Sequence, residues 1–174
     1  DNDANCFALG ERFFGEGQTI PNFVGLTLGT GLGGGIIQQG KLLDDANCGS
    51  GEFGEIPYKE HNLEYYCSGS YFMNEWHING KEMHERAMQN DPIALEAYRQ
   101  LGLHLSVAVK IVVLTLDPQL IVFGGSVAEA HSLFEASLKE GLKDFPYPNS
   151  INRLQIRYSN LRNAGILGAA SLCY

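Results

Sequence analysis

A glycine-rich segment of the sequence offers backbone N–H groups to an anionic ligand. Residues 22 to 40 read as a β-hairpin, with one strand at Phe23–Leu28 and the return strand closing through Ile36 and Ile37. Between them, Thr30 to Gly35 forms a glycine-rich tip, in which Thr30 supplies a hydroxyl and the glycines leave the backbone open to a phosphate. A plain tight hairpin is the alternative, because glycine is common at hairpin tips for backbone reasons alone.

Two better-known phosphate-binding motifs match the spacing of residues in this segment, but each lacks a feature that the motif requires. Gly29 to Gly34 has the dinucleotide spacing GxGxxG, yet a strand follows it where that motif needs a helix. Gly35 to Lys41 has the Walker spacing GxxxxGK, yet Leu42 stands where a hydroxyl must meet Mg²⁺. We therefore interpret neither match as a nucleotide-binding motif.

Asp3 could act as a general base. It precedes a helical stretch from Cys6 to Phe14, so one of residues 1 to 5 should cap that helix and Asp3 should lie near the positive end of its dipole. A carboxylate there can orient an alcohol and accept its proton. An ordinary helix cap is the commoner use of such a residue.

Three further carboxylates could bind hydroxyl groups. Glu52 and Glu55 lie among glycines rather than on a solvated helix face, and Glu64 follows shortly after. Carboxylates accept hydrogen bonds from neighbouring hydroxyls, which a polyol ligand presents. Solvated surface charge is the alternative reading of the same residues.

Other chemistries lack support in the sequence. His77 and His84 could share a helix face, but neither they nor His61 and Cys67 have further ligands at zinc-site spacing. No serine lies in a GxSxG elbow, so acyl transfer is not indicated.

Composition limits the class of protein. The 174 residues are 44% hydrophobic, enough to bury the core of one domain, or of one domain and part of another. The net charge of -8 argues against nucleic acid or an anionic membrane surface as a partner of this segment. The four cysteines form no CxxC pair, which favours a reduced, cytoplasmic setting. We also expect no signal peptide and no apolar run long enough to span a bilayer.

The elements that must position these residues alternate after the hairpin. Asp91-Pro92 predicts the start of a long, mostly buried helix that ends at Leu116. A short apolar strand at Leu120 to Phe123 follows, and then an amphipathic helix from Ala128 to Leu142. A strand from Arg153 to Tyr158 and a helix from Gly165 to Leu172 complete the pattern. This order predicts an α/β domain with a mixed sheet.

Collinear motifs across nearly the whole chain resemble the ROK family of sugar kinases and sugar-responsive repressors. They are Asn2-Asp3-Ala4-Asn5 with Leu9-Gly10-Glu11, Leu28 to Ile36, Gly51-Glu52-Phe53-Gly54, Glu64 with Ser68-Gly69, Asp117-Pro118 with Ile121 to Gly125, and Gly165 to Ala170. The resemblance implies the actin-like, ribonuclease H-like ATPase fold, a mixed β-sheet flanked by helices. It also implies ATP and Mg²⁺ as cofactors, and a homodimer.

The resemblance also implies a role for each matching residue. Asp3 matches the catalytic base, and Asn2 matches its sugar-binding neighbour. The carboxylates that hold the sugar hydroxyls match Glu52 and Glu64. Glu55 stands where most family members have a histidine, and we keep it as a substrate-binding candidate for its place beside Glu52. The phosphate loop matches Thr30 and Gly31, and the turn on the adenosine side of ATP matches Gly124 and Gly125.

The chain departs from the family pattern in two places. The interval from Ile56 to Leu63 lacks the cysteines of the family's zinc motif, so we expect no structural zinc and do not assign Glu55 to one. The family's N-terminal domain with its first phosphate loop is also absent. We therefore expect a C-terminal portion in which residues 1–20 form an interdomain helix and residues 21–174 form the α/β domain, with the last helix packing toward the absent domain.

These observations favour an ATP-dependent kinase that phosphorylates a glucose- or fructose-like hexose. This chain would be part of that kinase, and we expect the chain alone to be inactive. The alternative is the sugar-binding domain of a ROK transcriptional repressor. A third reading is an isolated interaction domain without activity. The matching Asp3 and the glycine tip favour the kinase.

Overall fold

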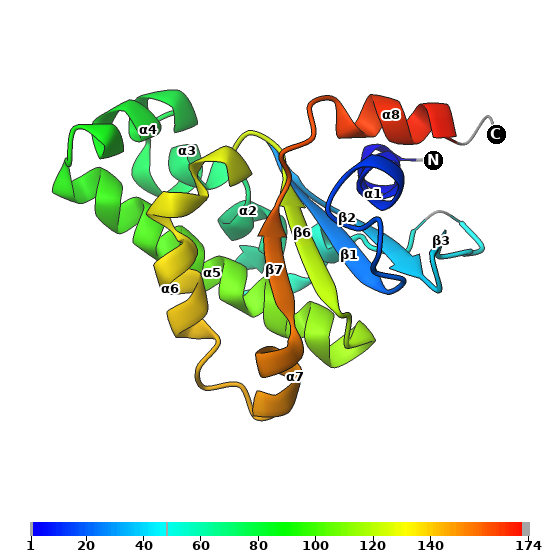
Figure 1. Ribbon diagram of the computed structural model, residues 1–174. Coiled ribbons are helices and arrows are strands. Elements are labelled where there is room, and N and C mark those ends of the chain that lie inside the picture. Colours follow the sequence, from blue (N-terminus) through cyan, green and yellow to red (C-terminus); the bar gives the residue numbers. More distant parts are fainter. Residues whose placement is uncertain (1, 48, 172–174) are drawn as a thin grey trace.

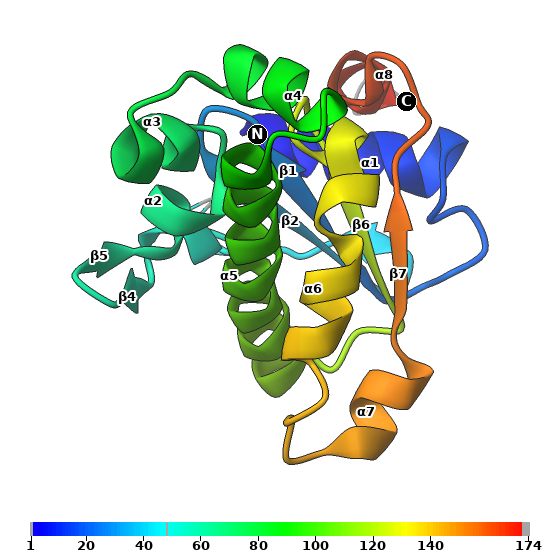
Figure 2. The same cartoon turned by 90° about the vertical axis from the view of Figure 1, so that its left-hand side faces the viewer.

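A mixed five-stranded sheet lies between two layers of helices in the computed structural model, which describes residues 2–47 and 49–171. One layer is α1 (Asp3–Phe14) with α8 (Ala164–Ser171), and the other contains α5 (Pro92–Leu116) and α6 (Glu135–Gly141) (Figures 1 and 2). This is the α/β architecture with a mixed sheet that the element order predicts.

The remaining elements connect or extend these layers. The strands of the main sheet are β1 (Phe23–Leu28), β2 (Leu32–Gln38), β3 (Lys41–Leu42), β6 (Leu120–Gly124) and β7 (Gln155–Tyr158). A small hairpin consists of β4 (Pro57–Tyr58) and β5 (His61–Asn62). The other helical segments are η1 (Phe53–Glu55), α2 (Leu63–Cys67), α3 (Ser70–Trp76), α4 (Gly80–Met88), η2 (Ala128–Leu133) and α7 (Pro148–Arg153).

The sheet has the order β3-β2-β1-β6-β7. β1 pairs antiparallel with β2, which confirms the predicted hairpin, and parallel with β6, which pairs parallel with β7. Side chains alternate between the two faces of the sheet. On β1, for example, Phe23 packs in the α1 layer, whereas Val24 and Leu26 pack in the core with α5.

Several glycines predicted at the hairpin tip lie instead within β2. Gly33, Gly34 and Gly35 pair with β1, so the tip is only Gly29-Thr30-Gly31. The reason is the close approach of α1 to the sheet, since a Cβ on Gly35 would lie 2.4 Å from the carbonyl oxygen of Ala4. Glycine at this position lets the helix that carries Asp3 lie directly on the strand.

Helix α5 begins and ends as its sequence predicts. The Asp91 carboxylate accepts a hydrogen bond from the N–H of Ile93 at 2.9 Å, and Pro92 opens the helix. Contrary to expectation, α5 is long and apolar enough to cross a membrane by length and composition alone. Half of its most apolar window is buried inside the protein, as in the core helix of a globular domain.

The single helix predicted over 128–142 is wrong. The segment forms η2 and α6, separated at Phe134, and Ala130 has a non-helical φ of -90° and ψ of 21°. The change in direction lets α6 run beside α5, where a Cβ on Gly102 would lie 2.4 Å from the Phe134 carbonyl oxygen (Figure 2). Tertiary packing therefore overrides the amphipathic pattern.

Helix α8 packs closely on α1. A Cβ on Gly168 would lie 1.8 Å from the carbonyl oxygen of Cys6, and one on Gly10 would lie 2.1 Å from that of Ala164. Backbone therefore meets backbone on both sides of this contact. The expectation that the last helix also packs toward another domain stays a prediction.

An aromatic cluster holds the β4–β5 hairpin and α2 against α5, in the interval where the family pattern has its zinc motif. Its centre is His104, only 5% exposed, whose Nδ1 lies 3.0 Å from the Tyr58 hydroxyl. The rings of Tyr66 and Tyr71 pack beside it, and His61 stacks on Tyr65 at 3.8 Å between centroids. The expected absence of zinc stays a prediction.

We expect this cluster to make folding stability sensitive to mild acid. Burial, and secondarily the charge of Lys59, lowers the pKa of His104 to about 4. The unfolded chain then binds the extra proton first, so stability falls as the pH drops below about 6.5. This group should contribute a loss of about 2 kcal/mol in the free energy of unfolding between pH 7 and pH 5.

The measurement is urea denaturation at both pH values for the native chain and for His104→Gln, whose amide can still hydrogen-bond to Tyr58. The native chain should lose more stability than the variant by that amount. An equal loss in both proteins would show that His104 does not carry the effect.

Candidate functional site

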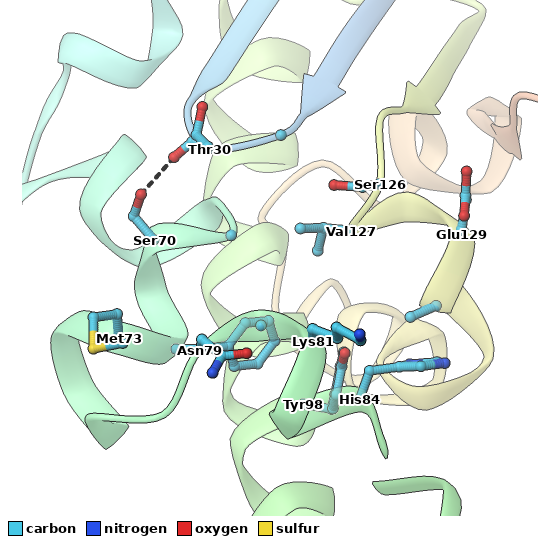
Figure 3. A pocket seen from close by; sticks show the side chains of 15 residues that line it. Thr30, Ser70, Met73, Asn79, Lys81, His84, Tyr98, Ser126, Val127 and Glu129 are labelled. Carbon is cyan, nitrogen blue, oxygen red and sulfur yellow. Dashed lines mark hydrogen bonds between the residues drawn. The ribbon is translucent and has the colours of Figure 1, made fainter. Parts of the chain in front are cut away.

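The tip of the β1–β2 hairpin is held by the start of α3. The Gly69 N–H donates to the Gly29 carbonyl at 2.7 Å, and the Ser70 hydroxyl donates to the Thr30 carbonyl at 2.6 Å (Figure 3). The Gly29 N–H donates to the Gly31 carbonyl at 3.0 Å, which closes the turn. The Thr30 side chain itself is exposed. The tip is thus anchored to α3 through its backbone and presents the Thr30 hydroxyl, as a phosphate contact requires.

A second glycine turn lies at the same edge of the sheet. Gly124 ends β6, and Gly125 has a φ of +89°, a conformation that favours glycine. A Cβ on Gly125 would lie 2.5 Å from the Leu28 carbonyl oxygen, and the same oxygen accepts from the Val127 N–H at 3.1 Å. Because β1 and β6 are parallel, both turns meet where α/β proteins commonly bind ligands.

A cavity of about 660 Å³ opens between the hairpin tip and α4. Figure 3 shows Thr30 and Ser70 on the hairpin side, with Lys81 and His84 from α4 opposite them. Phe72, Met73 and Val127 add apolar walls. The volume falls within the range of small-molecule sites, about 300–1,000 Å³. Apolar walls with polar groups near a phosphate-compatible loop suit a nucleoside with its phosphates.

The candidate sugar-binding residues start with Asn2 and Asp3 at the N-terminus of α1. Asn2, one of the five candidate caps, is the helix cap, since its Oδ1 accepts from the Asn5 N–H at 2.8 Å. Its Nδ2 donates to the Glu52 carboxylate at 3.3 Å. Asp3 lies in the first turn of the helix and is exposed. The structure therefore brings the Asn2–Asp3 pair and Glu52 together across fifty residues of sequence.

Glu64 joins this region to the hairpin. Its Oε2 accepts from the Leu32 N–H at 3.0 Å, directly after the tip. Glu55 lies in η1, exposed, and its side chain makes no hydrogen bond or ion pair within the described part of the chain. The three glutamates thus differ: Glu52 contacts Asn2, Glu64 contacts the hairpin, and Glu55 has no such partner among the described residues.

Asp3 also faces a cavity of its own, again of about 660 Å³. Gly124 and Gly125 line it, and so does Arg162, the only cation among its described lining residues. Ser126 and Glu129 line both this cavity and the one in Figure 3, so the two adjoin. The nucleotide-sized cavity and the cavity that Asp3 faces therefore share part of one wall.

Several lining residues were missed from the sequence. Lys81 and Arg162 carried no motif, and His84 was considered only as a metal ligand. Ser68-Gly69 in the family pattern was the available signal for Ser70. Across residues 2–47 and 49–171, no group of three His, Cys, Asp or Glu side chains comes together to hold a metal ion.

Comparison with known proteins gives consistent matches. A family model described as the ROK family matches residues 1–174. A glucokinase of Thermotoga maritima is 29% identical over 99% of this chain and 64% of its own length. A ROK family glucokinase from Streptomyces griseus, solved in complex with glucose and AMPPNP, has a TM-score of 0.84 and 28% identity over 99% of this chain and 66% of that one.

A regulator is equally similar in structure. A ROK family transcriptional regulator, described as a homolog of the E. coli MLC protein, has a TM-score of 0.85 and 26% identity over 97% of this chain and 50% of that one. The chain therefore spans half to two thirds of the length of these proteins. The likeness in structure confirms the expected actin-like fold.

Proposed function

The chain belongs to the ROK family, and from that membership we propose that it forms part of an ATP-dependent kinase of a hexose such as glucose or fructose. One observation carries the proposal beyond homology. The cavity beside the Thr30 loop shares the wall residues Ser126 and Glu129 with the cavity that Asp3 faces, which supports transfer of a phosphate from a nucleotide in the first to an acceptor in the second. Sugar kinases need this relation between phosphate and base.

Asp3 is proposed as the base. Its carboxylate takes the proton of a sugar hydroxyl as the hydroxyl oxygen bonds to the γ-phosphorus, and the bond from that phosphorus to the β-phosphate oxygen breaks to release ADP. Asn2, Glu52, Glu55 and Glu64 are proposed to hold the sugar hydroxyls. The contact between Asn2 and Glu52 supports a shared site for these groups.

The nucleotide is proposed to bind in the cavity of Figure 3. Thr30 and Gly31 would contact the phosphates through the hydroxyl and backbone N–H groups. Gly124 and Gly125 were expected on the adenosine side, yet they line the Asp3 cavity, whereas Ser126 and Val127 face the nucleotide cavity. We therefore place the glycines near the phosphates.

Mg²⁺ is proposed to accompany ATP and to neutralise phosphate charge. Such ions commonly bind through substrate phosphates and one or two carboxylates, which agrees with the lack of a three-residue metal cluster in the described residues. Glu129, which lines both cavities, is proposed as one such carboxylate.

Two features of the whole protein remain part of the proposal. Residues 1–20, which contain α1, would belong to the region between domains, and the protein would act as a cytoplasmic homodimer without nucleic acid bound to this segment. The alternative function is a sugar-binding regulator, which the likeness to the transcriptional regulator favours. A regulator would bind the sugar without turning over ATP.

The test is a coupled assay of ADP formation with hexoses and N-acetylhexosamines, together with calorimetric binding of each sugar. It is applied to the 174-residue chain and to any longer protein that contains it. A kinase gives sugar-dependent ADP formation in the longer protein and little in the chain alone. Sugar binding without ADP formation would instead support the regulator.

A further inference from the structure

The Glu64 carboxylate is enclosed by the hairpin on one side. Its Oε2 accepts from the Leu32 N–H at 3.0 Å. A Cβ on Gly31 would lie 2.4 Å from the same oxygen, and one on Gly54 would lie 3.5 Å from it. The carboxylate therefore fits between two glycines, and one of them is the last residue of the hairpin tip.

One carboxylate oxygen is left for a ligand. A carboxylate accepts about four hydrogen bonds through its two oxygens. No hydrogen bond to the Oε1 of Glu64 occurs within residues 2–47 and 49–171, and the residue is only half-buried. A hydroxyl can therefore reach Oε1 while Oε2 stays bonded to the hairpin.

We propose that Glu64 couples sugar binding to nucleotide binding, a proposal that rests on the function proposed above. A sugar hydroxyl on Oε1 orients the carboxylate, and Oε2 then orients the Leu32 N–H and with it the Gly29-Thr30-Gly31 tip. A nucleotide that meets this ordered tip loses less conformational freedom on binding and so binds more tightly. Linkage requires the nucleotide to tighten sugar binding by the same factor.

The hairpin and α3 support this transmission. The tip is anchored on its other side by Gly69 and Ser70, so it cannot relax freely away from Glu64. The tip thus has two anchors. The contacts to Gly69 and Ser70 stay the same, whereas a bound sugar would adjust the contact to Glu64.

The test measures the affinity for AMPPNP by calorimetry with and without saturating D-glucose. In the native protein, D-glucose should tighten AMPPNP binding at least about fivefold. Gly31→Ala should bring this ratio close to one, because the new methyl group displaces the carboxylate although Glu64 itself is retained. The φ of Gly31 lies outside the left-handed region, so alanine fits the backbone there.

Gly29→Ala is the matched control on the same tip. A Cβ at Gly29 meets no atom within 4 Å, so the ratio should stay at its native value whatever the change in either affinity alone. A native ratio of one, or equal ratios in the two variants, would overturn the coupling while leaving the kinase proposal intact. If AMPPNP, or both D-glucose and D-fructose, fail to bind the native protein, the proposed function and the coupling both fail.

Discussion

Replacing Asp3 with asparagine is expected to lower kcat at least about a thousandfold, while the affinity for the sugar stays within about threefold. Asparagine has nearly the size of aspartate and still accepts a hydrogen bond, so contacts to a bound sugar persist. It cannot take up the proton that the attacking hydroxyl must lose. Since Asp3 is exposed in the first turn of α1, the substitution should leave the fold intact.

The measurement combines the coupled kinase assay of a longer protein that contains this chain with calorimetric sugar binding. Asp44→Asn is the matched control, because Asp44 is also an exposed aspartate and lies in the loop after β3. The control should keep native kcat. An unchanged kcat in Asp3→Asn would remove Asp3 from the role of base.

Replacing Gly168 with alanine is expected to destabilise the protein by about 2–3 kcal/mol. The new methyl group would lie 1.8 Å from the Cys6 carbonyl oxygen and 2.7 Å from the Gly10 nitrogen, and both are backbone atoms that cannot turn aside. Helix α8 must then move away from α1. Because α1 carries Asn2 and Asp3, ligand binding should weaken along with stability.

Gly165→Ala on the same helix is the control, measured with Gly168→Ala by thermal unfolding. A Cβ at Gly165 meets no atom within 4 Å, and alanine should raise helix stability by up to about 1 kcal/mol. The melting temperature should therefore fall for one variant and hold or rise for the other. Equal shifts would contradict the account of the α1–α8 contact.

The sequence correctly predicted the helices and strands that are marked by residues within or next to them. Asp91-Pro92 marks the start of α5, and Leu120 to Phe123 forms the expected buried strand. A helix cap or an apolar run acts over a few residues, so these elements can be predicted without knowledge of the rest of the fold. The exact cap of α1, Asn2, was among the five candidates.

Elements shaped by contacts across the chain were harder to predict. Gly33 to Gly35 resemble a loop, yet they form a strand that pairs with β1, with α1 against Gly33 and Gly35 and the Phe53 ring against Gly34. The pattern of 128–142 is that of one helix, yet packing along α5 breaks it at Phe134. In both cases the deciding partner is distant in sequence.

The candidate site shows the same division. Motif positions such as Thr30, Gly31 and Gly125 do lie at one edge of the sheet, where β1 and β6 end. The cavity walls formed by Lys81, His84 and Arg162 come from segments without a motif, and only the fold brings them there.

The most direct test of the central claim is a crystal structure of the protein with D-glucose and AMPPNP. The account predicts the nucleotide in the cavity of Figure 3, with its phosphates at Thr30 and Gly31. It also predicts a sugar hydroxyl within hydrogen-bonding distance of the Asp3 carboxylate and in line with the γ-phosphate. A sugar bound out of reach of Asp3, or a nucleotide bound elsewhere, would contradict it.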